Sequence, residues 1–188
     1  MQEPNQANAP LIEMLDEATR LPDVDQTTDY IKTELCHLIR AGAISLSPEH
    51  EQAMPDRYAR RLLHRSEALN YSVVVMTWGP EQATSIHDHA GMWCVEGVCM
   101  GEIDVDQFEL VDKKNDRYRF EKRGSYTAGV ASAGCLIPPY EYHRIANRDQ
   151  EQVAVTVHIY GGDMTSCNAF EKVGDGWYEP QERTLSFD

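Results

Sequence analysis

The sequence predicts a mainly β fold, in which α-helices precede a small barrel of short strands. Apolar residues recur at helical spacing over roughly the first 65 residues, and they alternate with a period of two from Tyr71 onwards. Glycine, proline, aspartate and asparagine separate the later apolar segments. Many short strands joined by such turns are typical of a β-barrel or sandwich.

A chain of 188 residues is expected to form one domain with a sizeable core. Within it we distinguish three parts by their apolar pattern. Residues 1–65 are predicted to be mostly helical, residues 66–165 to form the barrel, and residues 166–188 to pack on the barrel as a tail.

The helices of the first part are predicted from apolar spacing and from end signals. Residues 11–15 and 31–39 each carry apolar side chains at helical spacing, and Gly42 lies where the second helix would stop. Residues 47–49 combine a capping hydroxyl, a proline and an acidic side chain, which favours a further helix start.

The clearest strand is predicted for residues 152–160. Its odd-numbered positions are valine or isoleucine, whereas the even-numbered positions include Thr156, His158 and Tyr160. Because side chains alternate between the two faces of a strand, these three polar residues share one face. We therefore expect them to line the barrel together.

Other strands are predicted from shorter patterns. The apolar run 71–78 is typical of a fully buried strand. Alternation at residues 103–105 continues at 108–110 in the opposite phase. Such a shift predicts a β-bulge near residues 106–107.

Composition limits the classes of function. A net charge of −14 argues against nucleic acid and against anionic membrane surfaces as partners. No apolar run is long enough to span a bilayer, and residues 1–10 lack the basic-then-apolar order of a signal peptide. The five cysteines are odd in number and widely spread, which is typical of a reduced protein. We therefore expect a cytoplasmic protein.

A pair of histidines is the strongest sign of chemistry. His87 and His89 are two residues apart just after the predicted strand 71–78. In an extended segment both side chains point the same way, so they can provide two of the three ligands of a metal site.

Two sequence blocks extend this hypothesis. The first reads His87-x-His89-x4-Cys94-x6-Gly101, and the second runs from Pro138 to His143 and on to Asn147. In this order they resemble the two motifs of the cupin superfamily, a fold of small jelly-roll-like β-barrels. Two positions depart from those motifs: Cys94 stands where most cupins have glutamate, and Tyr140 stands where the second motif has glycine.

With cysteine at position 94, the first block resembles that of the thiol dioxygenases, in particular the cysteine dioxygenase family. The resemblance covers roughly Tyr58 to Asp163 and includes Trp78-Gly79-Pro80. It implies iron(II) held by three histidines and no carboxylate. The ligands that it implies are His87, His89 and His143.

The same resemblance implies roles for further residues. Arg60 would bind the substrate carboxylate, with adjacent Arg61 as the alternative, and Tyr58 would line the substrate site. Tyr160 would offer its hydroxyl to oxygen or to the carboxylate, and His158 and Thr156 would orient it. Cys94 either forms a thioether bond with Tyr160, as in animal members of the family, or is a small buried residue.

These expectations define a leading function and two alternatives. The leading one is an iron(II)-dependent dioxygenase that adds both atoms of O2 to the sulfur of a small thiol, converting L-cysteine to cysteine sulfinate. The second changes the substrate to 3-mercaptopropionate or mercaptosuccinate; relatives acting on 3-mercaptopropionate typically have Gln at the position of Arg60. The third is a cupin that binds a ligand or a structural metal such as zinc without catalysis. The oligomeric state is left open, with a monomer compatible with all three.

Overall fold

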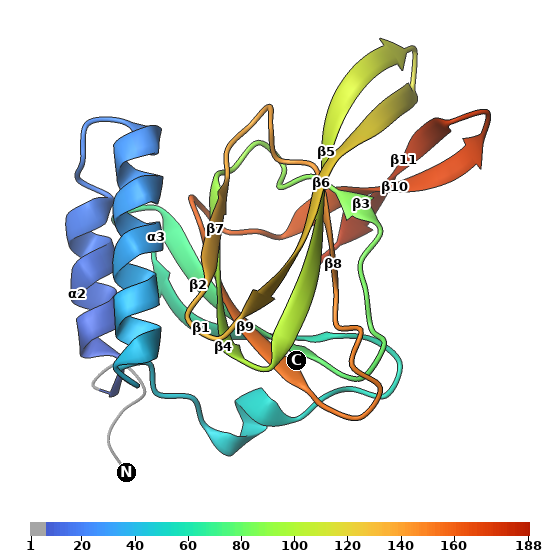
Figure 1. Ribbon diagram of the computed structural model, residues 1–188. Helices are drawn as coiled ribbons and strands as arrows, with labels where there is room; N and C mark the ends of the chain where they lie inside the picture. The colour runs from blue at the N-terminus through green and yellow to red at the C-terminus, as the bar shows by residue number, and fades with distance from the viewer. Residues whose placement is uncertain (1–6) are drawn as a thin grey trace.

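The computed structural model describes residues 7–188, in which two α-helices lie against one side of a β-structure (Figure 1). The helices are α2 (Ala9–Ala18) and α3 (Val24–Arg40), and a single 3-10 turn, η1 (Pro48–Glu51), follows them. The predicted class, mainly β with helices before the barrel, is confirmed. Within residues 7–188, no helix is long and apolar enough to cross a membrane.

Local signals set the two ends of α3. The Asp23 side chain accepts a hydrogen bond of 2.8 Å from the backbone N–H of Gln26, which satisfies one free donor of the first turn. Gly42, two residues beyond the helix, has a φ of +65°, a left-handed conformation that glycine adopts without a steric penalty. The predicted stop at Gly42 is confirmed.

The strands follow η1 in chain order. They are β1 (Ala59–Ser66), β2 (Tyr71–Trp78), β3 (Ile86–His87), β4 (Cys94–Met100), β5 (Glu102–Lys114), β6 (Arg117–Gly129), β7 (Ala133–Leu136), β8 (His143–Ala146), β9 (Ala154–Tyr160), β10 (Ser166–Gly174) and β11 (Trp177–Thr184).

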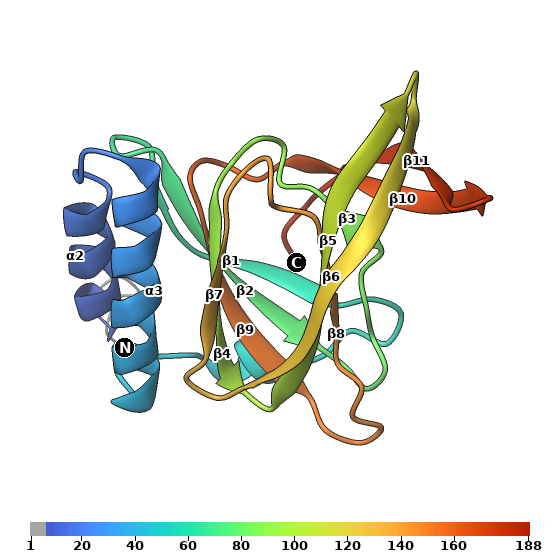
Figure 2. The ribbon, with the colours of Figure 1, turned by 45° about the horizontal axis from the view of Figure 1, so that its top comes forward.

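These strands form two sheets. The first has five antiparallel strands in the order β1-β2-β9-β4-β7, and the other six pair in a closed ring in the order β10-β11-β6-β5-β8-β3. Figure 2 shows α2 and α3 on the outer side of the first sheet, with the β5–β6 and β10–β11 hairpins reaching away from the helices. The inner face of the first sheet is therefore the side on which both sheets meet.

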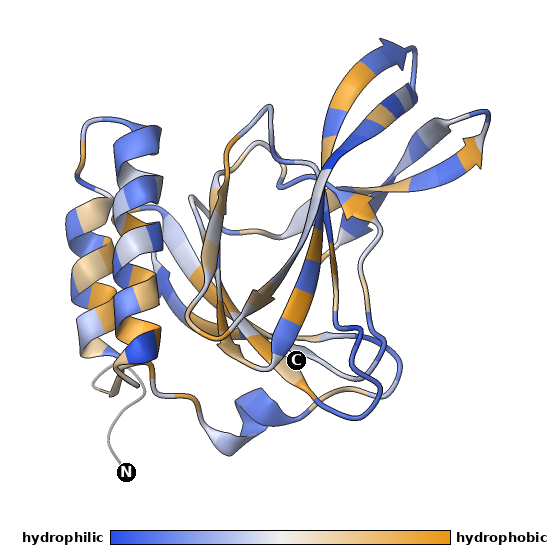
Figure 3. Ribbon diagram, viewed as in Figure 1, coloured by the Kyte–Doolittle hydropathy of each residue, from blue (hydrophilic) through white to orange (hydrophobic). Residues whose placement is uncertain are grey.

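Alternation along β9 divides the core into two layers. Val155, Val157 and Ile159 pack with the apolar side chains of α2 and α3. The alternate residues of the same strand, which include His158 and Tyr160, point to the opposite side and are also buried. The predicted two faces of this strand are confirmed, and its polar face lies between the sheets. Figure 3 shows the same alternation of hydrophobic and hydrophilic residues along β5.

The pairing of β5 with β6 shifts register between Gln107 and Phe108, which confirms the predicted bulge. The boundaries of the three predicted parts differ from the observed elements. Strand β1 lies almost entirely within the part predicted to be mostly helical; it contains its own register shift between Leu62 and His64, which interrupts the alternation that marks a strand. Residues 166–184 form a hairpin, β10–β11, whose first strand pairs with β3.

Candidate metal centre

Three histidines converge at one end of the space between the sheets. His87 ends β3 and is the register partner of His143, the first residue of β8. His89 lies two residues beyond β3. The ring centroids are 4.5 Å apart for His87 and His143, 5.0 Å for His89 and His143, and 5.3 Å for His87 and His89. Their candidate ligand nitrogens all lie within 4.8 Å of one another.

The protonation of His87 and His143 suits a metal ion. The Nε2 atoms of His87 and His143 face each other at 3.0 Å. Burial, followed by the neighbouring His89, lowers the pKa of His87 to about 3, and burial holds the pKa of His143 well below its usual range. Neutral imidazoles present lone pairs, and lone pairs that face one another in a buried site are satisfied by a shared cation. The three residues therefore fit a divalent metal ion.

Each of the three rings has an acceptor on its Nδ1 side. His87 Nδ1 is 3.1 Å from the carbonyl oxygen of Ser85. His89 Nδ1 is 3.4 Å from Glu141 Oε2 and His143 Nδ1 is 3.7 Å from Glu96 Oε1; these are ion-pair distances, and neither Nδ1 makes a hydrogen bond among the described residues. An acceptor at Nδ1 favours the tautomer whose Nε2 is free to bind a metal.

The two glutamates differ in how they are held. Glu141 Oε2 also accepts the backbone N–H of His89 at 2.7 Å, so that this carboxylate is tied to the ligand loop. Burial raises the pKa of Glu96 to about 8, and a divalent cation bound to His143 would act in the opposite direction.

A cavity of about 520 Å³ opens beside His87. Its lining includes Tyr58, Arg60, Met76 and Tyr160, and it continues to residues 183–186 at the end of β11. Tyr58 stacks on Trp78 with ring centroids 4.6 Å apart, which fixes one wall. The cavity thus brings the predicted substrate residues next to a predicted ligand.

Arg60 and Arg61 point in different directions. Arg60 is 4% exposed and donates hydrogen bonds of 3.2 Å to the carbonyl oxygens of Met164 and Ser186. Its Nε atom has no hydrogen-bond partner among the described residues. Arg61 instead donates to Thr77 Oγ1 at 3.1 Å and to the Gln52 carbonyl at 2.9 Å. Of the two arginines, Arg60 lies at the cavity.

Cys94 and Tyr160 are direct register partners on β4 and β9, and both side chains are buried. Burial raises the pKa of both groups well above their usual values, while a hydrogen bond from Tyr160 acts in the opposite direction on Cys94. The tyrosine ring lies 6.1 Å from that of His89, measured between centroids.

His158 makes different contacts from those expected. Its Nε2 is 2.8 Å from Thr156 Oγ1, which also accepts a hydrogen bond of 2.9 Å from the indole N–H of Trp78. The rings of His158 and Tyr160 are 6.1 Å apart, and no hydrogen bond joins these two side chains in the described structure. The expectation that His158 orients the Tyr160 hydroxyl directly is therefore not supported by a contact.

Sequence reasoning missed Glu96 and Glu141. A period-two count from Cys94 along the strand puts Glu96 on the same face, and a charged residue there in an otherwise apolar strand was the available signal. Glu141 had no comparable signal, because its contact with His89 joins segments 52 residues apart.

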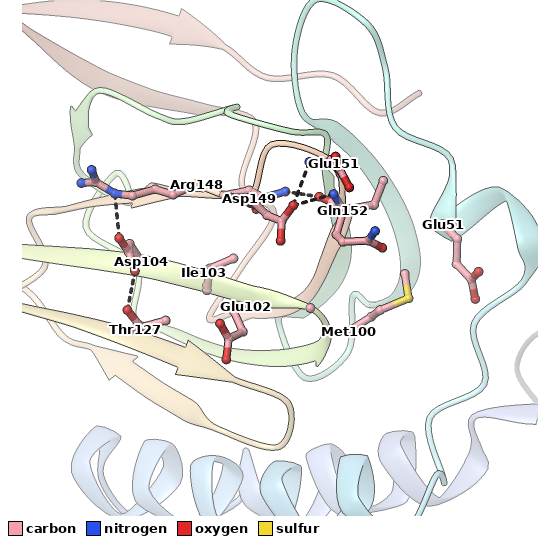
Figure 4. Close-up of a pocket in the computed structure, with 13 residues that line it drawn as sticks. Glu51, Met100, Glu102, Ile103, Asp104, Thr127, Arg148, Asp149, Glu151 and Gln152 are labelled. Carbon is pink, nitrogen blue, oxygen red and sulfur yellow. Dashed lines mark hydrogen bonds and ion pairs between the residues drawn. The ribbon is translucent and has the colours of Figure 1, made fainter.

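A second cavity, larger than the one at His87, lies elsewhere (Figure 4). It has a volume of about 760 Å³ and contains none of the three candidate ligands. Arg148 pairs with Asp104 at 2.6 Å, and Asp149 accepts the backbone N–H groups of Glu151 and Gln152. Arg148 and Asp104 thus pair with each other, and Asp149 binds the backbone of the adjoining loop.

The closed strand ring, the facing sheet and the three convergent histidines define a cupin with a candidate metal centre. The sequence model of the family described as cysteine dioxygenase type I matches residues 48–173. The chain belongs to this family.

Curated relatives agree with this assignment. Cysteine dioxygenase type 1 of Rattus norvegicus is 25% identical over 116 residues, which cover 62% of this chain and 56% of the relative. The Homo sapiens protein of the same name is 24% identical over the same shares. The chain thus spans a little over half the length of the curated relatives that it matches.

Solved structures share less with the chain. The protein TT1209 from Thermus thermophilus has a TM-score of 0.47 at 16% identity, and the match covers 62% of this chain and 94% of that protein. The cupin domain of Schizosaccharomyces pombe Cnp3 has a TM-score of 0.46 at 11% identity, with 64% and 70% covered. Likeness at this level carries no conclusion about ligands or activity.

Proposed function

We propose that this protein is an iron(II)-dependent thiol dioxygenase. The observation that carries the proposal is the convergence of three histidines beside a cavity that holds Arg60 and Tyr160. Membership of the cysteine dioxygenase type I family supports the same conclusion. The five cysteines are free thiols in the structure, in keeping with a cytoplasmic protein.

In this proposal, the three histidines bind the metal ion and the ion binds the thiolate of the substrate. His87, His89 and His143 would hold the ion through Nε2. A ferrous ion with three neutral ligands keeps its 2+ charge and open positions, and so supplies the binding of thiolate and the redox chemistry that adds both atoms of O2 to sulfur. The product is a sulfinate, and no other oxidant is required.

Arg60 favours L-cysteine as the substrate. Its guanidinium is held by two carbonyl oxygens, and its unpaired Nε can donate to a carboxylate in the cavity. Tyr58 also lines the cavity, and its ring stacks on that of Trp78. 3-Mercaptopropionate and mercaptosuccinate also carry carboxylates, so they remain the alternative substrates.

We also propose that Cys94 and Tyr160 form a thioether bond. The two residues are directly opposite each other on neighbouring antiparallel strands, where Cβ atoms lie about 4.5–5.5 Å apart. The bond removes two hydrogen atoms, which O2 accepts during turnover. Intact mass should therefore fall by two hydrogens in protein that has turned over and stay constant in Cys94→Ala.

Oxygen uptake by iron-loaded protein tests the function. L-Cysteine, 3-mercaptopropionate and mercaptosuccinate are compared, and each product is identified by mass. We expect uptake and a sulfinate with L-cysteine, and none from His143→Ala. Tight zinc in freshly isolated protein, with no oxidation of any thiol after exchange for iron, would instead support a cupin with a structural metal.

A further inference from the structure

Glu96 is a buried acid at the centre of β4. It is 6% exposed, and its neighbours along the strand are apolar. It is the register partner of His158 on β9, and it lies one step further along the same face of β4 as Cys94. A carboxylate at such a position costs free energy unless donors satisfy it.

Two imidazoles face this carboxylate. His143 Nδ1 lies 3.7 Å from Oε1, and His158 Nδ1 lies 3.4 Å from Oε2. Neither Oε2 nor His143 Nδ1 makes a hydrogen bond with any described residue. The carboxylate is therefore the acceptor available to both rings.

The tautomer of His158 follows from its other contact. Thr156 Oγ1 accepts the indole N–H of Trp78 at 2.9 Å, and among the described residues His158 Nε2, at 2.8 Å, is the acceptor within reach of its own hydrogen, so we assign that hydrogen to His158 Nε2. The hydrogen of the neutral imidazole then lies on Nδ1, towards Glu96.

The tautomer of His143 follows from the metal centre. Its Nε2 faces His87 Nε2 at 3.0 Å, on the side where the three candidate ligands converge. Its Nδ1 therefore carries the hydrogen and points away from the centre, towards Glu96. Glu96 lies behind a ligand and not beside the ligand nitrogens.

We propose that Glu96 is a positioning residue that accepts the Nδ1–H of both His143 and His158. It holds the metal ligand in the tautomer that binds through Nε2, and it joins that ligand to the chain His158, Thr156 and Trp78. The inference rests on the metal centre of the proposed function, but not on turnover or on the identity of the thiol.

A second arrangement competes with this one. Ligand atoms of Cys94, Glu96 and His158 also lie within 4.8 Å of one another, so they could hold a second ion. His158 Nε2 is already hydrogen-bonded to Thr156, so a second ion would bind through Nδ1, the atom that lies 3.4 Å from Glu96 Oε2. The positioning role keeps this contact between His158 and Glu96, whereas a second ion would replace it.

The first test measures affinity for zinc by competition with a chelator. Glu96→Gln keeps the shape of the side chain but can accept from only one imidazole, and its amide group confronts the other. We expect a loss of zinc affinity of about 10- to 100-fold. The matched control is Asp106→Asn, which alters another buried carboxylate, bonded to Ser125 and Lys122 and to no histidine. It should bind zinc within about twofold of wild type.

The second test needs no variant and so does not depend on folding. Nitrogen NMR of histidine-labelled, zinc-loaded wild type should show His158 protonated at Nδ1. The inference is overturned if His158 is protonated at Nε2, or if each chain binds two zinc ions. It is also overturned if Glu96→Gln keeps the zinc affinity of wild type, or if Asp106→Asn loses as much zinc affinity as Glu96→Gln.

The proposed function can fail separately. If Glu96→Gln binds zinc more weakly and the wild type oxidises no thiol with iron, the positioning role stands without dioxygenation. If the wild type oxidises L-cysteine and Glu96→Gln binds zinc normally, dioxygenation stands and the positioning role falls.

Discussion

At the scale of single residues, the centre depends on what surrounds each charged side chain. The guanidinium of Arg60 is nine-tenths buried but faces two backbone carbonyls and no carboxylate among the described residues. Its Cζ atom also lies 5.3 Å from the ring centre of Phe187. A buried cation with neutral partners keeps its attraction for an anion that enters the cavity.

Replacement of Arg60 by glutamine should therefore act on the carboxylate of the substrate. We expect kcat/KM for L-cysteine to fall about 10- to 100-fold, since a hydrogen bond to a charged group contributes about 1.5–3 kcal/mol. For cysteamine, which has no carboxylate, kcat/KM should change little. Steady-state oxygen uptake with both thiols measures the difference.

Arg61→Gln is the control, because Arg61 bonds Thr77 and Gln52 away from the cavity. An equal loss with cysteamine in Arg60→Gln, or a larger loss for L-cysteine in Arg61→Gln, would contradict the role of Arg60.

A second residue, His50, makes the stability of the folded state depend on pH because it is buried. Its Nδ1 accepts the backbone N–H of Ser47 at 3.1 Å, and burial lowers its pKa below the usual value of 6.5. As pH falls below 6.5, the unfolded chain gains a proton that the folded chain lacks, so the folded state loses stability. The effect is absent well above this value and grows as the solution becomes more acidic.

His50→Gln should remove this contribution. Between about pH 7.5 and 5, the free energy of unfolding should decline less in the variant than in wild type. The difference between the two slopes should be no more than about 1.4 kcal/mol per pH unit. Urea unfolding across this range measures it. His37, exposed on α3, provides the control His37→Gln; identical pH profiles for wild type and His50→Gln would refute the assignment.

At the scale of elements, α3 and β4 are packed with little spare room. A Cβ atom added at Gly97 would lie 2.8 Å from Leu35 Cδ2 and 2.9 Å from Ile39 Cδ1. The other face of β4 carries Cys94 and Glu96 towards the barrel interior. The same strand therefore supports the helices on one side and the candidate centre on the other.

Gly97→Ala should push α3 and β4 apart. Overpacking of this kind costs about 1–3 kcal/mol, so we expect the melting temperature to fall by roughly 3–10 °C. Gly134→Ala, on neighbouring β7, is the control, since its added Cβ would meet only Tyr126 Oη at 3.6 Å. Thermal unfolding followed by circular dichroism compares them; equal melting temperatures for the two variants would show that the helix yields freely.

At the scale of the whole molecule, the sequence predicted the parts that depend on local pattern. The alternation predicted for residues 152–160 and the bulge at 106–107 are properties of single strands; the alternation is confirmed over residues 154–160, where β9 lies, and the bulge is confirmed as well. Contacts between distant strands were beyond such reasoning. Glu96 reaches His143 only because β4 and β8 lie on opposite sheets that meet in space, and no local pattern encodes that meeting.

Metal should stabilise the entire fold, because the ligands join separated parts of the chain. His87 and His143 pair β3 with β8 in the six-strand ring, and β3 also pairs with β10. An ion that binds only the folded state adds about 2.7 kcal/mol when its free concentration is about a hundred times its dissociation constant. Chelation should thus lower the melting temperature by roughly 5–10 °C.

The shift should also increase with the concentration of added iron(II) or zinc, measured anaerobically by differential scanning calorimetry. His143→Ala, which removes one ligand, should show almost no response to metal. A melting temperature that is the same with metal and with chelator in the wild type would mean that the three histidines do not bind an ion in the folded protein.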